Sequence, residues 1–282
     1  LSPHLDDAIL SCAGRILRHV ARGERVVLLT VFSHADPNDA AGWAARRRED
    51  ERAAAHLGAE PRWLGMPDAP FRDPAYADFD FDVLSGPHAP GDAQWRERLN
   101  ARLHDELATL RPTTLYAPLG VGDHVDHRLV FEAAAGLHPR PLGYEDHPYA
   151  LVPHAVRRRL DALGLVTDDP PPPPSPAAYL EALMAAPYVQ RYLPPGPARE
   201  RCFARLRAWP AAPRRHRVHA ELEPLDPAAA ALAEAAIWAY ESQAPGLYAT
   251  PERYRALVRA HAERLGSPAP RVERYWLDAT PP

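Results

Sequence analysis

The sequence predicts an α/β protein whose mostly parallel sheet carries helices on both faces, with a helical or irregular C-terminal extension. Three observations predict this fold class. Strand-like apolar runs alternate with helix-like segments through the first half, which is the order of a doubly wound sheet. The run 26–32 is nearly all apolar, as in a parallel strand buried on both faces. The second half is dominated by helix-like segments.

The first half divides into alternating helices and strands. Leu1 reads as the end of a strand, and apolar residues then recur at helical spacing. Gly23 and Gly58 follow helix-like segments, where glycine is a typical stop. The predicted helices cover 7–22, 46–57, 95–110 and 127–137, and the predicted strands cover 26–32, 62–65, 114–118 and 141–144.

Two proline-rich stretches interrupt this pattern. Residues 66–91 read as an irregular loop whose acidic and aromatic side chains suit a pocket wall. Residues 168–176 have the composition of a stiff connector or a disordered loop. Residues 177–282 are interpreted as helical additions to one domain, whose site lies in a core of residues 1–150. Their predicted elements are helices 177–186, 197–208, 228–240 and 251–265 and a last strand, 271–277.

Composition excludes several functions. The chain has 282 residues, 46% hydrophobic and 25% charged, with a formal net charge of −4. This balance gives no general attraction to nucleic acid or to an anionic membrane. The absence of lysine excludes a Schiff-base or lysine-nucleophile mechanism. The arginine runs 46–48, 157–159 and 214–215 are interpreted as solvated helix or loop faces.

Cysteine usage and hydropathy bear on the compartment. Cys12 and Cys202 lie far apart, so there is no CxxC redox pair and no cysteine-based zinc motif. The apolar run 26–32 is too short to cross a bilayer, and no signal peptide is visible. The chain opens with Leu1 instead of Met, so we expect residues before it. We expect a cytoplasmic protein without stable membrane insertion.

Two short turns combine histidine with carboxylates. The first, at 2–7, reads SPHLDD, and the second, at 122–127, reads GDHVDH. Each follows a strand-like run and opens a helix-like one. Ligands of open α/β sheets bind at the carboxyl ends of the strands, so two such turns on neighbouring strands would face one pocket.

The spacing of these residues suits a metal site that activates water. His4 and Asp7 are three residues apart, as are His124 and His127, so each pair can turn toward one point. Imidazole and carboxylate are common catalytic zinc ligands, while iron, cobalt or manganese would fit in part. Zinc brings the pKa of bound water to about 7, and a carboxylate that is not a ligand can take the proton. Asp6 fits that second role.

Each motif alone also has a plain structural interpretation. The chain has 14 histidines, so an HxxH pattern can arise by chance. Asp6 or Asp7 could simply cap a helix, and His4 could simply pack against it. The two motifs together, each after a strand and before a helix, favour the metal site.

In this order and at this separation, the two motifs resemble those of the PIG-L/LmbE family of zinc-dependent N-acetylglucosaminyl deacetylases. The resemblance runs from Leu1 to about Tyr149 and includes the helix 46–58 and the segment 144–149. It implies a Rossmann-like α/β fold. It also implies hydrolysis of an N-acetyl group, with a small-molecule N-acetylated sugar conjugate as the partner.

The same resemblance implies a role for each motif residue. Asp6 would be the general base that deprotonates the water. His124 would be the second acid/base group, which holds the oxyanion or protonates the leaving amine. Asp126 would orient His124 by a hydrogen bond. A single zinc ion per chain would be bound by His4, Asp7 and His127.

Two positions depart from the family pattern. Many members carry Pro where this chain has Leu5, and Glu where it has Ala8. Leu5 is expected to point away from the site, so we expect no loss of metal. Ala8 removes a carboxylate beside the site, which leaves the subfamily and the substrate open.

Five further side chains are candidates for the pocket rim. Arg48 and Glu51 lie one turn apart on the predicted helix 46–57 and would reach sugar hydroxyls, although a surface ion pair fits them equally well. The others follow the strand 141–144, at an edge that often carries function. They are Tyr144, Glu145 and His147.

Three functions compete. The leading one removes an N-acetyl group from an amino-sugar-type conjugate by metal-activated water. The second is an amidase that acts on another N-acyl or thiol conjugate. The third is a non-catalytic sugar- or nucleotide-binding module, but the ligands and the base are present, and residues 11–14 offer one glycine instead of a GxGxxG loop.

Overall fold

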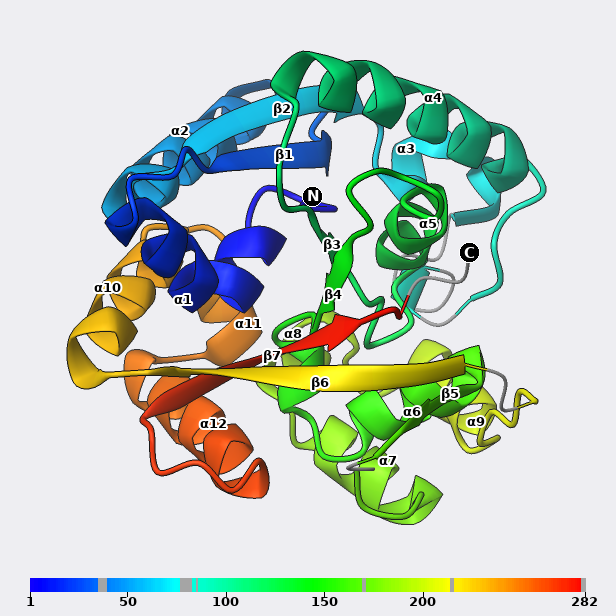
Figure 1. Cartoon of the computed structure of the whole chain (residues 1–282). Helices are drawn as coiled ribbons and strands as arrows, with labels where there is room; N and C mark the ends of the chain where they lie inside the picture. The colour runs from blue at the N-terminus through cyan, green and yellow to red at the C-terminus, as the bar shows by residue number, and fades with distance from the viewer. Residues whose placement is uncertain (35–39, 77–82, 85, 169–170, 214–215, 280–282) are drawn as a thin grey trace.

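The computed structural model describes residues 1–34, 40–76, 83–84, 86–168, 171–213 and 216–279 (Figure 1). Its strands form two sheets. Strands β1 (Val27–Phe32) and β2 (Glu60–Met66) pair in parallel. The second sheet has the order β3-β4-β7-β6-β5. Its strands are β3 (Tyr116–Pro118), β4 (Leu142–Tyr144), β5 (Leu165–Thr167), β6 (His216–Leu225) and β7 (Arg271–Leu277).

The five-stranded sheet is mixed in direction. Strands β3 and β4 are parallel, as are β5 and β6, whereas β7 runs antiparallel to both of its neighbours. The α/β class follows the prediction, but within this sheet parallel pairing is confined to the two pairs of strands on either side of β7. Strand β7 lies between β4 and β6 and pairs antiparallel with both. The sequence did not predict β6, so this arrangement could not be foreseen.

The first two residues join the two sheets. The amide of Ser2 donates to the carbonyl of Leu29 at 2.9 Å, and the amide of Val31 donates back to Ser2 at 2.9 Å. The amino group of Leu1 donates to the carbonyl of Tyr116 at 2.6 Å. Residues 1–2 therefore lie between β1 and β3, where Figure 1 marks the N-terminus.

Helices cover both faces of the first sheet. Leu28 packs into a core with α1 (Asp7–Ala21), α2 (Ala40–Leu57) and α10 (Pro227–Trp238). Its neighbour Leu29 points the other way, into a core with α4 (Asp92–Leu110) and α5 (Val125–Ala133). Alternation of side chains along β1 explains this division, because successive residues of a strand face opposite sides. Figure 1 shows the two groups of helices on either side of β1 and β2.

The second half of the chain is mainly helical. Helices α7, α10 and α12 each begin with a proline, after Ser175, Asp226 and Thr250, whose side chains accept hydrogen bonds from backbone amides of the first turn. The elements not bounded above are α3 (Ala69–Arg72), α6 (Ala155–Leu163), α7 (Pro176–Met184), α8 (Pro187–Tyr192), α9 (Pro197–Leu206), α11 (Ala244–Tyr248) and α12 (Pro251–Arg264), with 3-10 turns η2 (Pro74–Tyr76) and η4 (Tyr149–Leu151).

The two halves share one core. A single cluster of buried apolar side chains combines Ala13 and Leu57 from the first half with Ile237 and Tyr248 from the second. Glu49 of α2 accepts hydrogen bonds from the amide and the hydroxyl of Ser242 at 2.9 and 2.6 Å. The helical additions therefore pack directly against the elements that carry the first motif.

Two sequence interpretations need correction. The stretch 66–91 is not uniformly irregular, since it contains α3 and η2, although residues 77–82 and 85 lie outside the described ranges. The run 157–159 is not a solvated face. Arg158 donates to Asp123 and to two carbonyls, and Arg159 donates to the carbonyl of Leu119. These partners come from distant loops, so a run of arginines alone could not reveal them. Residues 169–170 and 214–215 also lie outside the described ranges.

A search for membrane spans gives a negative result. Among the helices in the described ranges, none combines the length and the apolar character needed to cross a bilayer.

Candidate metal centre

The first motif forms a tight turn beside β1. The hydroxyl of Ser2 donates to the carbonyl of His4 at 2.6 Å and accepts from the amide of Ala8 at 3.0 Å. The carbonyl of Pro3 accepts from the amide of Phe32, the last residue of β1. These bonds hold His4 at the carboxyl end of the strand and place Asp7 at the first position of α1.

The second motif turns sharply after β3. Gly122 and Asp123 have φ angles of +95° and +64°, in the left-handed region where glycine is favoured. A Cβ on Gly122 would lie 2.4 Å from Cγ of Tyr149, so the close approach of that ring also requires glycine. The turn then enters α5 at His124, whose Nδ1 accepts a hydrogen bond from the amide of Asp126 at 3.2 Å.

Three ligand atoms from the two turns converge. Oδ2 of Asp7 lies 3.1 Å from Nδ1 of His4 and 3.2 Å from Nε2 of His127. Each of the three residues offers one ligand atom within 4.8 Å of those of the other two. Two imidazole nitrogens and one carboxylate oxygen are a donor set typical of catalytic zinc with an open position.

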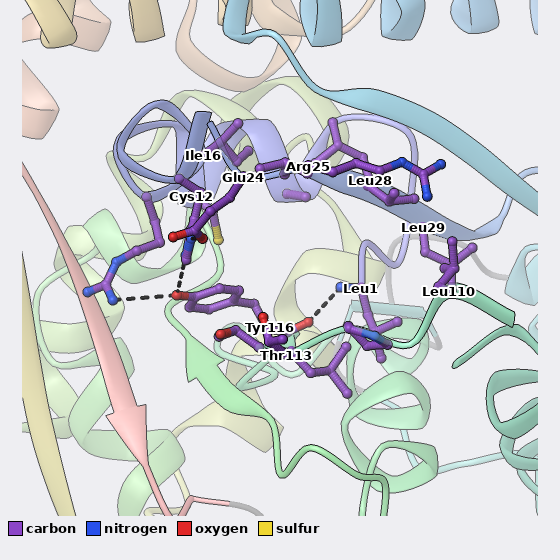
Figure 2. A pocket seen from close by; sticks show the side chains of 18 of the residues that line it. Leu1, Cys12, Ile16, Glu24, Arg25, Leu28, Leu29, Leu110, Thr113 and Tyr116 are labelled. Atoms are coloured by element: carbon purple, nitrogen blue, oxygen red, sulfur yellow. Dashed lines mark hydrogen bonds and ion pairs between the residues drawn. The ribbon is translucent and has the colours of Figure 1, made fainter. Parts of the chain in front are cut away.

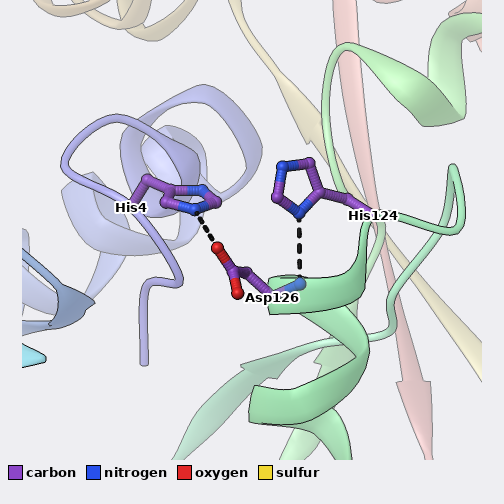
Figure 3. Close-up of side chains that lie close together, drawn as sticks. All are labelled: His4, His124 and Asp126. Atoms are coloured by element: carbon purple, nitrogen blue, oxygen red, sulfur yellow. Dashed lines mark hydrogen bonds and ion pairs between the residues drawn. The ribbon is translucent and has the colours of Figure 1, made fainter. Parts of the chain in front are cut away.

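A second group shares His4 and is shown in Figure 3. It contains His124 and Asp126, and Nε2 of His4 lies 3.1 Å from Oδ2 of Asp126. Unlike Asp7, Asp126 is also paired with an arginine. Nη1 of the fully buried Arg72 donates to it at 2.6 Å, and the amide of Ala69 donates at 3.2 Å. The first group therefore fits a metal ion better than the second.

His127 is held in the orientation that metal ligands usually have. Its Nδ1 lies 2.7 Å from Oδ1 of Asp146. Oδ2 of Asp146 accepts from the amides of Gly120 and Val121, both at 2.8 Å. A carboxylate behind a ligating histidine fixes the ring and its tautomer. Nε2 of His127 is buried and makes no hydrogen bond within the described part of the chain, which leaves it for a metal ion.

The charges around these atoms favour a cation. Burial lowers the pKa of His4, but hydrogen bonds to Asp126 and Asp7 outweigh it and raise that pKa well above the usual value. Burial likewise lowers the pKa of His127, but Asp7 and Asp146 raise it to about 9. Burial raises the pKa of Asp7, yet the two imidazoles hold it well below the usual value. The carboxylates thus stabilise positive charge where the ligand atoms meet.

His124 differs from the other two histidines. Burial, together with the nearby His127 and His4, lowers its pKa well below the usual value. Its ring is therefore neutral. Because Nδ1 accepts from a backbone amide, the single ring proton lies on Nε2. His124 can then donate a hydrogen bond to an oxygen atom in the cavity.

Asp6 is a buried carboxylate without a structural partner. Its side chain lines the cavity, makes no cap at the start of α1, and bonds to no other residue in the described ranges. Burial and the neighbouring Asp7 raise its pKa. A carboxylate whose pKa is raised toward neutrality is suited to accept a proton.

A cavity of about 190 Å³ is lined by five residues of the two motifs, namely His4, Asp6, Asp7, His124 and Asp126. Arg48 and Glu51, predicted for its rim, are exposed and do not line it. Arg46 lines it instead, because α2 turns that side of the helix toward the first motif. One arginine of the run 46–48 therefore lines the cavity, although the run as a whole was interpreted as a solvated face.

The other three rim candidates are buried and do not line this cavity. The hydroxyl of Tyr144 donates to the carbonyl of Leu1 at 2.9 Å. Glu145 accepts from Arg274 and from the indole of Trp276. His147 is 1% exposed, and its ring lies against His261 with centroids 5.6 Å apart. The cavity is lined by the next two residues, Pro148 and Tyr149.

Several site residues were missed or left unassigned by the sequence interpretation. Asp146 lies within the segment 144–149 and received no separate role, yet its place two residues after β4 was a usable signal. Arg72, which binds Asp126, lies in a stretch interpreted as loop. Asp68 follows β2 and lines the cavity, and its buried Oδ1 makes no hydrogen bond within the described ranges. Burial raises the pKa of Asp68 to about 6.

A larger cavity, of about 410 Å³, lies away from the metal-capable side chains (Figure 2). It is bounded by α1, β1 and the segment around Tyr116, with Ile16 and Leu28 among its apolar lining. The hydroxyl of Tyr116 bonds to Nε2 of His19 at 2.9 Å. Neither metal-capable group of the described residues lies in this cavity. The smaller, polar cavity is therefore the candidate site.

Comparisons with known proteins concern the segment that holds both motifs and the fold as a whole. Residues 1–137 match the family model described as PIG-L, GlcNAc-PI de-N-acetylase. This segment holds both motifs, and its match to the family model confirms the resemblance drawn from them.

Two curated relatives are both named 2'-N-acetylparomamine deacetylase. The one from Streptomyces fradiae is 35% identical over 190 residues, which are 59% of this chain and 63% of the relative. The one from Niallia circulans is 28% identical over 184 residues, which are 53% of this chain and 66% of the relative. The chain thus spans slightly less than two thirds of the length of each relative.

Solved structures support the fold over nearly the whole chain. The zinc-inhibited form of teicoplanin deacetylase Orf2 aligns with a TM-score of 0.61 at 18% identity, covering 98% of this chain and 95% of that one. The A40926 pseudoaglycone deacetylase Dbv21 aligns with a TM-score of 0.58 at 20% identity, covering 98% and 93%. The α/β fold class is confirmed, including the region beyond residue 137.

Proposed function

We propose that the protein is a zinc-dependent hydrolase that removes an N-acetyl group from an amino-sugar conjugate. The observation that carries the proposal is the convergence of His4, Asp7 and His127 next to an unpaired Asp6. The donor set fits zinc, and Nε2 of His127 is a buried nitrogen without a hydrogen-bond partner in the described chain. The match of residues 1–137 to a deacetylase family model supports the reaction type.

In this proposal the metal ligands, the proton acceptor and the hydrogen-bond donor are different residues. His4, Asp7 and His127 would hold the metal, which when bound supplies Lewis acidity and a water of lowered pKa. Asp6 takes a proton from the attacking water, since its carboxylate is free of other partners and its pKa is raised. His124 donates from Nε2 to the oxygen of the amide as negative charge develops there.

Asp126 has a different position from the one expected of it. Its backbone amide, not its carboxylate, bonds to His124. The carboxylate lies between Arg72 and Nε2 of His4. In this proposal Asp126 orients His4 through its side chain and His124 through its backbone.

The substrate class follows the named relatives. Two curated relatives are named for 2'-N-acetylparomamine, and two structural neighbours are named as deacetylases of teicoplanin and of the A40926 pseudoaglycone. An N-acetylated amino sugar attached to a further group is therefore the proposed substrate. No observation in the described chain favours a thiol conjugate or a nucleotide.

The test combines metal analysis with an acetate-release assay. The zinc-loaded protein is expected to release acetate from 2'-N-acetylparomamine. Asp6→Asn is expected to retain its metal while kcat falls by about 10²- to 10⁴-fold, because the proton acceptor is lost. Glu51→Gln, on the exposed face of α2, is the matched control and should match the parent. An Asp6→Asn variant as fast as the parent would rule out Asp6 as the base.

A further inference from the structure

The outer wall of the cavity comes from the second half of the chain. Beside the motif residues, the cavity is lined by Tyr188 and Tyr192 of α8 and by Gln243 and Leu247 at α11. These positions lie outside the segment 1–137 that matches the family model. The family resemblance therefore assigns them no role, and their placement depends on how α8 and α11 pack.

Three tyrosines form a continuous row that begins at the metal site. The ring of Tyr149 meets the ring of His127 edge to face, with centroids 5.5 Å apart. The ring of Tyr188 meets Tyr149 edge to face at 5.2 Å. Tyr192 lies one helical turn beyond Tyr188, on the same face of α8. The row thus leads outward from the position where the amide would react.

The three tyrosines differ in exposure, since Tyr188 is buried whereas Tyr149 and Tyr192 are half-buried. In the described ranges, no hydrogen bond engages the hydroxyl of Tyr149, Tyr188 or Tyr192. A tyrosine offers an apolar ring and one hydroxyl at its edge. A sugar ring has matching features, because its C–H face is apolar and its hydroxyls lie around the edge.

Close packing fixes the outermost ring. A Cβ on Gly246 of α11 would lie 2.1 Å from the hydroxyl oxygen of Tyr192. Only a residue without a side chain lets the Tyr192 ring rest against α11 at this position. The backbone of Gly246 does not need glycine for its conformation, since its φ is not positive. The glycine therefore sets the position of the tyrosine and not the course of the chain.

We propose that Tyr188 and Tyr192, the outer part of this row, form a subsite for a second ring of the substrate. This inference rests on the proposed function for its substrate class. The reacting N-acetylated sugar sits near His127 and Tyr149, and the ring attached to it lies along Tyr188 and Tyr192. The substrate class is then a glycoside with at least two rings, and a free N-acetylated monosaccharide leaves the outer part of the row unused.

Binding of reaction products tests this without turnover. The zinc-loaded full chain is titrated with paromamine, which has two rings, and with glucosamine, which has one. We expect the parent to bind paromamine more tightly. Tyr192→Ala should weaken paromamine binding by about fivefold, as expected for the loss of one aromatic contact. Glucosamine binding should change by less than about twofold.

Two further variants separate the ring from its position. Tyr192→Phe keeps the ring and should retain most of the affinity for paromamine. Gly246→Ala should weaken paromamine binding in the parent by displacing the ring, but should have no effect in the Tyr192→Ala background. Thermal unfolding of each variant checks that the fold is intact.

The outcomes distinguish the two proposals. Equal affinity of the parent for the two amines, or equal losses for both amines in Tyr192→Ala, would overturn the two-ring subsite. An additive effect of Gly246→Ala in the Tyr192→Ala background would also overturn it. Failure to release acetate from 2'-N-acetylparomamine, with these binding differences intact, would instead overturn the proposed reaction and leave the subsite standing.

Discussion

Two groups of metal-capable side chains share His4, and they differ in what neutralises their carboxylate. Asp126 lies 2.6 Å from a guanidinium nitrogen of the buried Arg72. Asp7 has no arginine partner in the described chain, and imidazole nitrogens at 3.1 and 3.2 Å surround its Oδ2. One carboxylate is paired with an arginine, while the other is surrounded by imidazoles and is proposed to bind a metal ion.

The comparison shows how similar ligand sets can have different functions. A buried carboxylate is costly unless it is paired, so each one needs a source of positive charge or a proton. Arg72 provides it for Asp126, and a metal ion is proposed to provide it for Asp7. A third buried carboxylate, Asp50 of α2, has no cationic partner at hydrogen-bond distance in the described chain. Its contact with the hydroxyl of Tyr240 favours a protonated carboxyl group. Proximity of histidine and aspartate alone would not have separated these cases.

The largest expected effect separates the two groups directly. Asp7→Ala should abolish metal binding and lower turnover on the order of a thousandfold, because the metal-activated water is lost. Asp126→Asn should keep its metal, because Asp126 is not in the proposed ligand set. Metal content after zinc loading and dialysis measures both variants. Metal retained in Asp7→Ala but lost in Asp126→Asn would reverse the assignment.

The second prediction concerns the arginine that distinguishes the groups. Arg72→Met removes the partner of Asp126 and of Asp92, to which Nε donates at 2.9 Å. Leaving buried charges unpaired should lower the free energy of unfolding by about 3–5 kcal/mol. Urea unfolding of chelator-treated protein measures this loss independently of metal.

A double variant serves as the control for that prediction. Adding Asp126→Asn to Arg72→Met removes one unpaired charge and should recover part of the lost stability. Exposed ion pairs contribute up to about 1 kcal/mol. If Arg72→Met lowers the free energy of unfolding by less than this, the buried charge of Asp126 is not stabilised mainly by Arg72.

The smallest expected effect concerns Asp50. The hydroxyl of Tyr240 lies 2.7 Å from Oδ1 of Asp50 and 2.6 Å from the carbonyl of Leu5, yet it has one proton for two acceptors. A protonated Asp50 can donate to Tyr240, which then donates to Leu5. Burial raises the pKa of Asp50 to about 6, against the effect of hydrogen bonds from Trp63 and Tyr240.

The direction of the pH effect follows from the raised pKa. A carboxyl group that holds its proton more tightly when folded stabilises the fold fully below pH 3.8, and this contribution is lost as pH rises through about 6. Asp50→Asn keeps a donor at every pH. Its free energy of unfolding relative to the parent should therefore rise by about 1 kcal/mol between pH 5 and pH 8. A constant difference across that range would show that Asp50 is ionised in the folded protein.

Much of the fold could be predicted because local patterns are strong in the first half. The helix predicted at 7–22 is observed at Asp7–Ala21, and the strand predicted at 26–32 is observed at Val27–Phe32. Strand β6 was missed because only two of its ten residues are buried, so it lacks an apolar run. It forms through pairing with β7, where Leu222 is opposite Arg274, and such pairing is not a local property.

The residues of the candidate site also fall into those that local motifs predicted and those that they did not. The sequence predicted that four side chains would meet, namely those of His4, Asp7, His124 and His127. The structure brings them together because the two turns follow neighbouring extended segments, residues 1–2 and β3. Side chains that depend on helix phase or on distant contacts were not foreseen. Arg46 lines the cavity where Arg48 was expected, and Tyr192 reaches it from a helix that local patterning did not indicate.

The most direct test is an anomalous difference map from crystals of the zinc-loaded protein, measured on either side of the zinc absorption edge. We expect one strong peak per chain, within bonding distance of Nδ1 of His4, Oδ2 of Asp7 and Nε2 of His127. A peak between His124 and Asp126, or no peak among these residues at full zinc loading, would contradict it.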